Sequence, residues 1–295
     1  MQLDIFDHGR DLMLRNDVLA ALERRDLAAA QAARQDLLEE YPDDASLATL
    51  ARLIEALQHG PGPAFGSHDA VQAARRWMDQ DVAPDARSSF DAPTAAAWLA
   101  GIWRELAQRA APLPFRAECG EDHAAALWLR AGDWPAVIDA VARIQSWRRS
   151  PAPLAWMAEA RWRQEGLDAV WPLLAELAWL APDRFDTLTR RLADPLVAAL
   201  RRRFDAEFEP DTEEPGDATV LAWFPAWVLT DTPALAARLG QARPCGDRAP
   251  ERALRLLLEL LTLGRQGDLD AIVQRRKALR DTQAALYAAY LKRAC

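Results

Sequence analysis

The amino-acid sequence predicts an all-α protein made of stacked antiparallel helical hairpins. Apolar residues recur at spacings of three and four residues along most of the chain, which is the pattern of helices with one buried face. Runs of alternating Val, Ile and Thr, which mark strands, are nearly absent. Short turns rich in Gly, Pro and Asp separate consecutive helical patterns, as hairpin connections do.

Four such turns divide the chain into hairpins. They lie at Arg25-Asp26, at Gly132-Asp133, at residues 165–168 and at Gly267-Asp268. Two longer breaks cover residues 60–69 and 207–217, and the first is expected to be a surface loop because its glycines lie among prolines with no strand before them.

The longer breaks suggest how the chain divides into domains. We expect a helical-hairpin repeat region over residues 1–206, an acidic linker or loop over 207–217, and a C-terminal helical region over 218–295. The alternative is one continuous domain.

Several helices in the second half are predicted in detail. Asp133 is placed to cap a helix in which Pro135 occupies the first turn. The segment from Trp171 to Ala181 is apolar on more than one side, so other helices must cover it on both sides. A second helix of this kind begins at Pro250 and ends before Gly264.

The hairpins resemble tetratricopeptide-type repeats, whose second helix carries a small residue, an apolar residue seven positions later and a proline five beyond that. The first-helix signature of the family does not recur in this chain. The resemblance implies a right-handed superhelix, an α-solenoid, with a concave peptide-binding surface. Two sets of residues fit the pattern, namely Ala30, Leu37 and Pro42, and then Val170, Leu177 and Pro182.

Composition narrows the setting in which the protein works. The net charge of -8 disfavours nucleic acid as a partner, because such binding depends on cations that neutralise phosphates. Only Lys277 and Lys292 are lysines, a bacterial-like bias that we attribute to genomic base composition. An odd number of cysteines, three in all, suits neither a disulfide framework nor a zinc site.

The same reasoning predicts a soluble protein of the cytoplasm that does not bind membranes. The first residues mix acids with bases, unlike an export signal. The longest apolar run, from Ala218 to Leu229, is shorter than the ~20 residues needed to cross a bilayer. We expect this run to form two short buried helices broken at Pro225.

No motif predicts a catalytic residue, a cofactor or a metal. Cys119, Glu121, Asp122 and His123 form the one tight group of possible metal ligands, but a second ligand pair is missing. The histidines are scattered and lie in no nucleophile or metalloprotease motif. The chain is therefore not expected to be an enzyme.

Aromatic and basic residues supply the candidate binding site. Of the twelve tryptophans, seven lie between Trp128 and Trp179, and most are expected to pack between helices. Guanidinium groups on the first helices of successive hairpins could clamp carboxylates of a partner. The residues predicted to bind a partner are Arg104, Arg130, Arg161, Arg163, Trp128 and Trp156.

Three functions remain open from the sequence. The leading hypothesis is a non-catalytic scaffold that binds a protein or peptide. The second is a carbohydrate-binding or other small-ligand domain, including an enzyme, with a Trp-lined pocket. The third is a regulatory module that forms a homodimer through its apolar C-terminal helices, residues 254–263 and 286–291.

Overall fold

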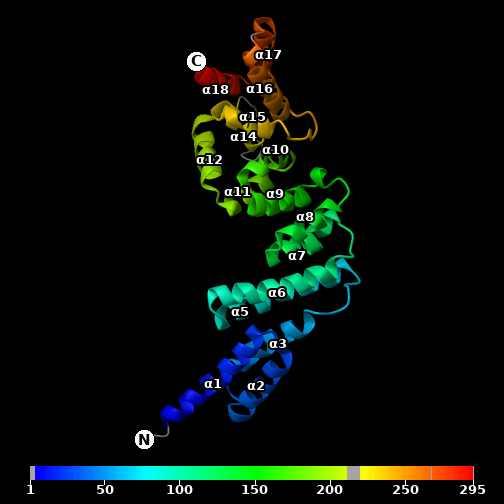
Figure 1. The fold of residues 1–295 in the computed structure, drawn as a ribbon, viewed down its shortest axis with the longest axis vertical. Coiled ribbons are helices and arrows are strands. Elements are labelled where there is room, and N and C mark those ends of the chain that lie inside the picture. The colour runs from blue at the N-terminus through cyan, green and yellow to red at the C-terminus, as the bar shows by residue number, and fades with distance from the viewer. Residues whose placement is uncertain (1–3, 211–219, 267, 295) are drawn as a thin grey trace. The chain divides into compact units, whose positions relative to one another are not determined.

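The structure, a computed structural model, describes residues 4–210, 220–266 and 268–294 (Figure 1). Within these ranges the secondary structure is helical and contains no strand, which confirms the all-α prediction. The chain forms two compact units, Met1–Ala140 and Val141–Cys295. Across the same ranges, no helix is long and apolar enough to span a membrane.

The first unit consists of α-helices joined by short turns, one π-helical turn and one 3-10 turn. In chain order these are α1 (Asp4–Glu23), α2 (Leu27–Glu40), α3 (Leu47–His59), α4 (His68–Trp77), the π-turn η1 (Met78–Val82), α5 (Ala83–Ser89), α6 (Ala92–Ala110), the 3-10 turn η2 (Ala117–Asp122), α7 (Ala124–Ala131) and α8 (Trp134–Ala142), which crosses into the second unit.

Neighbouring helices of this unit pack as pairs, α1 with α2, α2 with α3, and α6 with α7 (Figure 1). The predicted turn at Arg25-Asp26 joins the first pair, and the Asp26 carboxylate caps α2 by accepting a hydrogen bond from Ala29 N at 3.0 Å. Buried Trp98 on α6 donates its indole N–H to the Leu22 carbonyl at 3.0 Å. This bond ties α6 to the end of α1.

The turn between α7 and α8 follows the sequence prediction. Gly132 ends α7 in the left-handed conformation with φ of 68°, which glycine adopts at low cost. Asp133 then caps α8, because its carboxylate accepts a hydrogen bond from Ala136 N at 3.2 Å.

The second unit begins within α8 and is also helical where it is described. Its elements are η3 (Trp147–Arg149), α9 (Pro151–Glu165), η4 (Leu167–Ala169), α10 (Trp171–Leu180), α11 (Pro182–Leu192), α12 (Pro195–Glu207), α14 (Phe224–Asp231), η5 (Pro233–Leu235), α15 (Ala236–Leu239), α16 (Ala249–Gln266), α17 (Leu269–Thr282) and α18 (Ala284–Ala294).

Helix α10 is the centre of the second core. Every residue from Trp171 to Trp179 is buried, so the prediction that this helix is covered on both sides is confirmed. Helices α9, α11, α14 and α15 contact it. Burial of Leu221 through Thr230 places the apolar run near Pro225 in the same core.

The apolar run contains a break between two helical segments close to Pro225, as predicted. Val220 and Leu221 are helical, residues 222–223 form a turn, and α14 then begins at Phe224 with Pro225 in its first turn, where a missing N–H costs nothing. Of the predicted acidic linker, residues 211–217 lie outside the described residues. Glu207 is the last residue of α12, and the ring of Phe208 stacks on Phe204 with centroids 5.0 Å apart.

Candidate binding pocket between α3, α4 and α6

A pocket of about 250 Å³ lies in the first unit between α3, α4 and α6. We call it the α3–α6 pocket. Small and aliphatic residues and one methionine line part of it, two aromatic rings stand beside them, and polar side chains complete the lining. The lining residues are Glu55, Ala56, His59, Gly60, Phe65, Ala74, Trp77, Met78, Ile102, Leu106 and Arg109.

Arg109 near the end of α6 holds the loop that forms one side of the pocket. Its guanidinium donates to the carbonyl oxygens of His59 at 2.6 Å and Pro63 at 3.0 Å. The same group lies 4.1 Å from the centroid of the Phe65 ring, and Phe65 N donates to the Arg109 carbonyl at 3.0 Å. The loop after α3, expected from sequence to be a surface loop, is thus fastened to α6 at four points.

The rings of His59 and Trp77 meet in another part of the lining. Their ring centroids are 6.4 Å apart and their planes are nearly perpendicular, an edge-to-face contact. His59 Nδ1 donates to the carbonyl of Glu55 at 2.9 Å, so the imidazole keeps one orientation. The Glu55 side chain is exposed at the rim.

Gly60 leaves space for an ion pair behind the pocket. A Cβ at this position would lie 1.8 Å from Glu105 Oε2, so a side chain there would displace the carboxylate. Glu105 Oε1 accepts a hydrogen bond from Arg25 Nη2 at 2.6 Å. The pair links the turn after α1 to α6.

The structure places three of the predicted partner-binding residues in the first unit, outside the lining of the α3–α6 pocket. Arg130 on α7 donates to Asp79 at 2.6 Å, and its guanidinium lies 4.9 Å from the centroid of the Trp103 ring. Exposed Arg104 lies 3.5 Å from Asp133. Trp128 is half-buried and packs against the core of this unit.

The other three predicted residues lie on α9 in the second unit. Trp156 is buried with 4% of its surface exposed. Arg163 lies over Trp162, 4.8 Å from the ring centroid, and Arg161 Nε is 4.0 Å from Glu165. Trp156 is therefore a packing residue, whereas the guanidinium groups of Arg161 and Arg163 lie near the surface.

Three glutamates are buried in the second unit, Glu159, Glu176 and Glu251, and the pKa of the first two is shifted. Glu176 on α10 and Glu159 on α9 are both buried, and burial raises the pKa of each carboxyl above its ordinary value. Arg148 and the backbone N–H of Arg243 bond to Glu176 and oppose the shift. Arg191 pairs with Glu159.

Cys245 lies beside this network but is a poor nucleophile. Burial, together with the carboxylates of Glu176 and Glu251, raises the pKa of its thiol to about 11. The thiolate is the reactive form of cysteine, and little of it exists at neutral pH with such a pKa.

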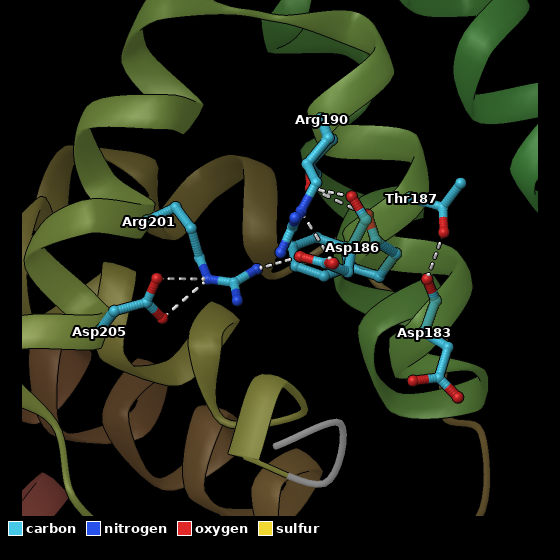
Figure 2. A network of polar contacts seen from close by, with 8 residues as sticks. Asp183, Asp186, Thr187, Arg190, Arg201 and Asp205 are labelled. Atoms are coloured by element: carbon cyan, nitrogen blue, oxygen red, sulfur yellow. Dashed lines mark hydrogen bonds and ion pairs between the residues drawn. The ribbon is translucent and has the colours of Figure 1, made fainter.

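A further polar network joins α11 to α12, where Arg201 reaches between the carboxylates of Asp186 and Asp205 (Figure 2). It donates to Asp186 at 2.7 Å and to Asp205 at 2.9 Å, and Arg190 pairs with the second oxygen of Asp186 at 2.9 Å. Each carboxylate is matched by a guanidinium, so this network clamps two helices together.

In the group of possible metal ligands at residues 119–123, Asp122 and His123 make hydrogen bonds that stabilise the fold. Asp122 is buried and accepts a hydrogen bond from Arg75 Nε at 2.7 Å. His123 caps α7 by accepting from Ala125 N at 3.1 Å. No set of three His, Cys, Asp or Glu side chains in the part of the chain that the structure describes is arranged to hold a metal ion.

Sequence reasoning missed the α3–α6 pocket. Arg109 and Phe65 are far apart in the chain, and nothing in the local pattern of either residue announces their contact. The one available signal was Phe65 itself, a large apolar residue in a segment otherwise made of Gly, Pro, Ala and Ser. Such a residue in a loop indicates that the loop packs against something.

Comparison of the chain with protein-family models, with curated protein sequences and with solved structures gave no match.

Proposed function

We propose that this chain is a non-catalytic helical scaffold of the α-solenoid kind, which binds a partner protein by holding one large apolar side chain in the α3–α6 pocket. The pocket itself is the observation that carries the proposal. Its residues include the aliphatic Ile102 and Leu106, with Phe65 and Trp77 as aromatic walls.

The size of the pocket favours a side chain over a cofactor. Pockets for small molecules usually have volumes of about 300–1,000 Å³. At about 250 Å³ the α3–α6 pocket falls below that range and suits a single large residue. Full burial of one such side chain contributes roughly 1.5–3 kcal/mol, so neighbouring surfaces must add to the affinity.

The packing of helices supports the scaffold part of the proposal. Hairpin pairs recur in both units, as in repeat proteins whose neighbouring pairs bury a continuous core. On α2 the tetratricopeptide-like positions Ala30 and Leu37 are buried, and Pro42 follows the end of the helix. Val170 and Leu177 are buried in the same way, and Pro182, five residues after Leu177, is the first residue of α11.

Arg104 and Arg130 are proposed to contact acidic groups of the same partner. Their present ion pairs with Asp133 and Asp79 lie near the surface, where such pairs contribute about 0–1 kcal/mol. A partner carboxylate can therefore replace Asp133 or Asp79 at small cost.

The proposal is tested by titrating the full chain with amino-acid mimics while observing the methionine methyl groups by NMR. Met78 lines the pocket, whereas Met157 is buried in the second unit and serves as an internal control. N-acetyl amides of leucine and phenylalanine are expected to shift the Met78 methyl resonance in a saturable way. The amides of serine and asparagine should leave it in place.

A matched pair of variants on α4 locates the effect. Ala74 lines the pocket and Ala73 is exposed, so Ala74→Leu fills the space while Ala73→Leu does not. Loss of the shift in Ala74→Leu alone supports the proposal. Equal Met78 shifts in Ala74→Leu and Ala73→Leu would overturn the proposal. A shift caused by N-acetylglucosamine but not by the apolar amides would also overturn it, and would favour the carbohydrate-binding alternative.

A further inference from the structure

A second hollow lies in the other unit, between α16 and α17, with a volume of about 400 Å³. We call it the α16–α17 groove. Two leucines and the small Ala271 form its apolar part, and polar side chains stand at its edges. The lining residues are Leu258, Glu259, Thr262, Leu263, Ala271, Gln274 and Arg275.

The groove exists because α16 is apolar on more than one side, as its sequence predicts. Leu254, Leu257 and Leu260 are buried. Leu258 and Leu263 flank this buried stripe on its two edges and are only partly buried, and both line the groove together with residues of α17. An open apolar surface of this kind on a helical hairpin is the form in which helical scaffolds receive a partner helix.

The hairpin formed by α16 and α17 is basic in an otherwise acidic chain. Residues 249–282 contain seven basic and five acidic residues, a net charge of +2, whereas the whole chain carries -8. The basic residues are Arg252, Arg255, Arg265, Arg275, Arg276, Lys277 and Arg280, and the acidic residues are Glu251, Glu259, Asp268, Asp270 and Asp281.

Some of these cations stand along the groove. Arg255 precedes Glu259 by four residues and Thr262 by seven, which places all three on one face of α16. Arg255 pairs with buried Glu251, and Arg275 Nε lies 2.5 Å from Glu259. Both arginine side chains remain nearly half exposed, so they can also meet carboxylates that approach from outside.

From this geometry we infer that the α16–α17 groove binds an amphipathic acidic helix of a partner protein. Apolar side chains of that helix would cover Leu258, Leu263 and Ala271, and its carboxylates would pair with Arg255 and Arg275. The inference is independent of the α3–α6 pocket, which lies in the other unit.

Other occupants fit the charge less well. A second copy of the chain would bring an equally basic hairpin to the groove, so like charges would face each other. An anionic membrane would also attract these cations, but its headgroup surface offers no apolar side chains to fill the part of the groove formed by Leu258, Leu263 and Ala271. An acidic helix matches both the apolar lining and the charge.

The inference is tested with a displayed library of single-helix peptides, selected on the full chain. The best helix is then made synthetically, and its affinity is measured by fluorescence anisotropy at several salt concentrations. We expect selected helices to carry an apolar stripe flanked by Asp and Glu. Arg275→Glu should weaken binding about tenfold or more, and Ala271→Leu, which fills the groove, should abolish it.

Arg280→Glu is the matched control, because Arg280 is an exposed arginine of the same helix outside the groove lining. It should change the affinity less than about twofold. The inference is overturned if no helix is selected, if the selected helices lack acidic residues, or if Arg275→Glu and Arg280→Glu weaken binding equally. Self-association of the chain, or binding to phosphatidylserine vesicles, that Arg275→Glu abolishes would also overturn it.

Discussion

The guanidinium of Arg109 fixes the loop that closes the α3–α6 pocket. It bonds to two carbonyl groups and stacks on Phe65, so a single side chain determines the position of one aromatic wall. Arg109 is thus a positioning residue for the proposed binding of an apolar side chain.

Replacing Arg109 with alanine should loosen this loop. Hydrogen bonds from a charged donor contribute about 1.5–3 kcal/mol, so we expect the local free energy of opening to fall by roughly that amount. The measurement is hydrogen exchange of the Phe65 amide, which bonds to the Arg109 carbonyl. The neighbouring exposed residue supplies the control, Gln108→Ala. If hydrogen exchange of the Phe65 amide is unchanged in Arg109→Ala, the position of the loop does not depend on the Arg109 side chain.

The buried carboxyl of Glu176 makes the stability of the second unit depend on pH. Burial raises its pKa above the ordinary value of 4.5, so the folded chain holds this proton more tightly than the unfolded chain does. The resulting stabilisation is fully present below pH 4.5. It is lost as the pH rises through the raised pKa of the folded state. Glu159 acts in the same direction.

Glu176→Gln should reduce the slope of unfolding free energy against pH without abolishing it, because the amide keeps an acceptor for Arg148 but does not titrate, while Glu159 still does. Urea unfolding of the second unit between pH 4.5 and pH 7 measures the effect. Glu165→Gln, at the exposed end of α9, should retain the wild-type slope. If the unfolding free energy of the wild type and of Glu176→Gln depends on pH with the same slope, Glu176 does not contribute to the pH dependence and the prediction is wrong.

At the scale of elements, α10 shows why the helices of the second unit are packed in layers. Nine consecutive residues of a helix point in all directions around its axis, so a helix with one wet face cannot bury all of them, as α10 does from Trp171 to Trp179. Leu173 and Leu174 are each 2% exposed. Helices must therefore cover α10 from more than one direction.

Leu173→Ala and Leu174→Ala should each destabilise the second unit by about 2–5 kcal/mol, the usual cost of a core cavity. On α11, which has one buried face, substitutions at two adjacent residues should instead differ in their effect on stability. Leu188→Ala should cost a similar amount, because Leu188 is 1% exposed, while exposed Thr187→Ala should change stability by less than about 1 kcal/mol. Thermal unfolding of the four variants checks the pattern. If Leu173→Ala or Leu174→Ala hardly changes stability, the face of α10 that carries that leucine is exposed to solvent, which would contradict the prediction.

Much of this element structure could be predicted from the sequence. The cap at Asp133, the start of α16 near Pro250 and the two-sided burial of α10 all follow from local signals such as capping residues and apolar spacing, whereas α16 continues past Gly264, where the sequence predicts its end, to Gln266. The α3–α6 pocket could not be predicted, because it depends on contacts such as Phe65 with Arg109 between distant segments. No local pattern marks the π-helical turn that contains Met78 either.

At the scale of the whole molecule, the described residues form a hydrophobic core in each of the two compact units. The first gathers residues such as Trp98 and Trp103, and the second is centred on α10. Each core belongs to one of the two compact units.

A chain with two cores should not unfold as a single two-state system. Trp98→Phe removes the indole hydrogen bond to the Leu22 carbonyl, which keeps its bond from Arg25 N, and the loss of one such bond costs about 0.5–1.5 kcal/mol and should lower the transition of the first unit. Leu173→Ala should lower the transition of the second. Calorimetry of both variants tests this, and one shared transition that moves equally in the two would contradict it.

The proposal that the α3–α6 pocket receives an apolar side chain is tested most directly by intermolecular NOE measurements on the full chain with bound N-acetylleucinamide. We predict NOEs from the leucine methyl groups of the ligand to the methyl groups of Met78, Ile102 and Leu106. NOEs to methyl groups elsewhere, with none to these three residues, would contradict the central claim.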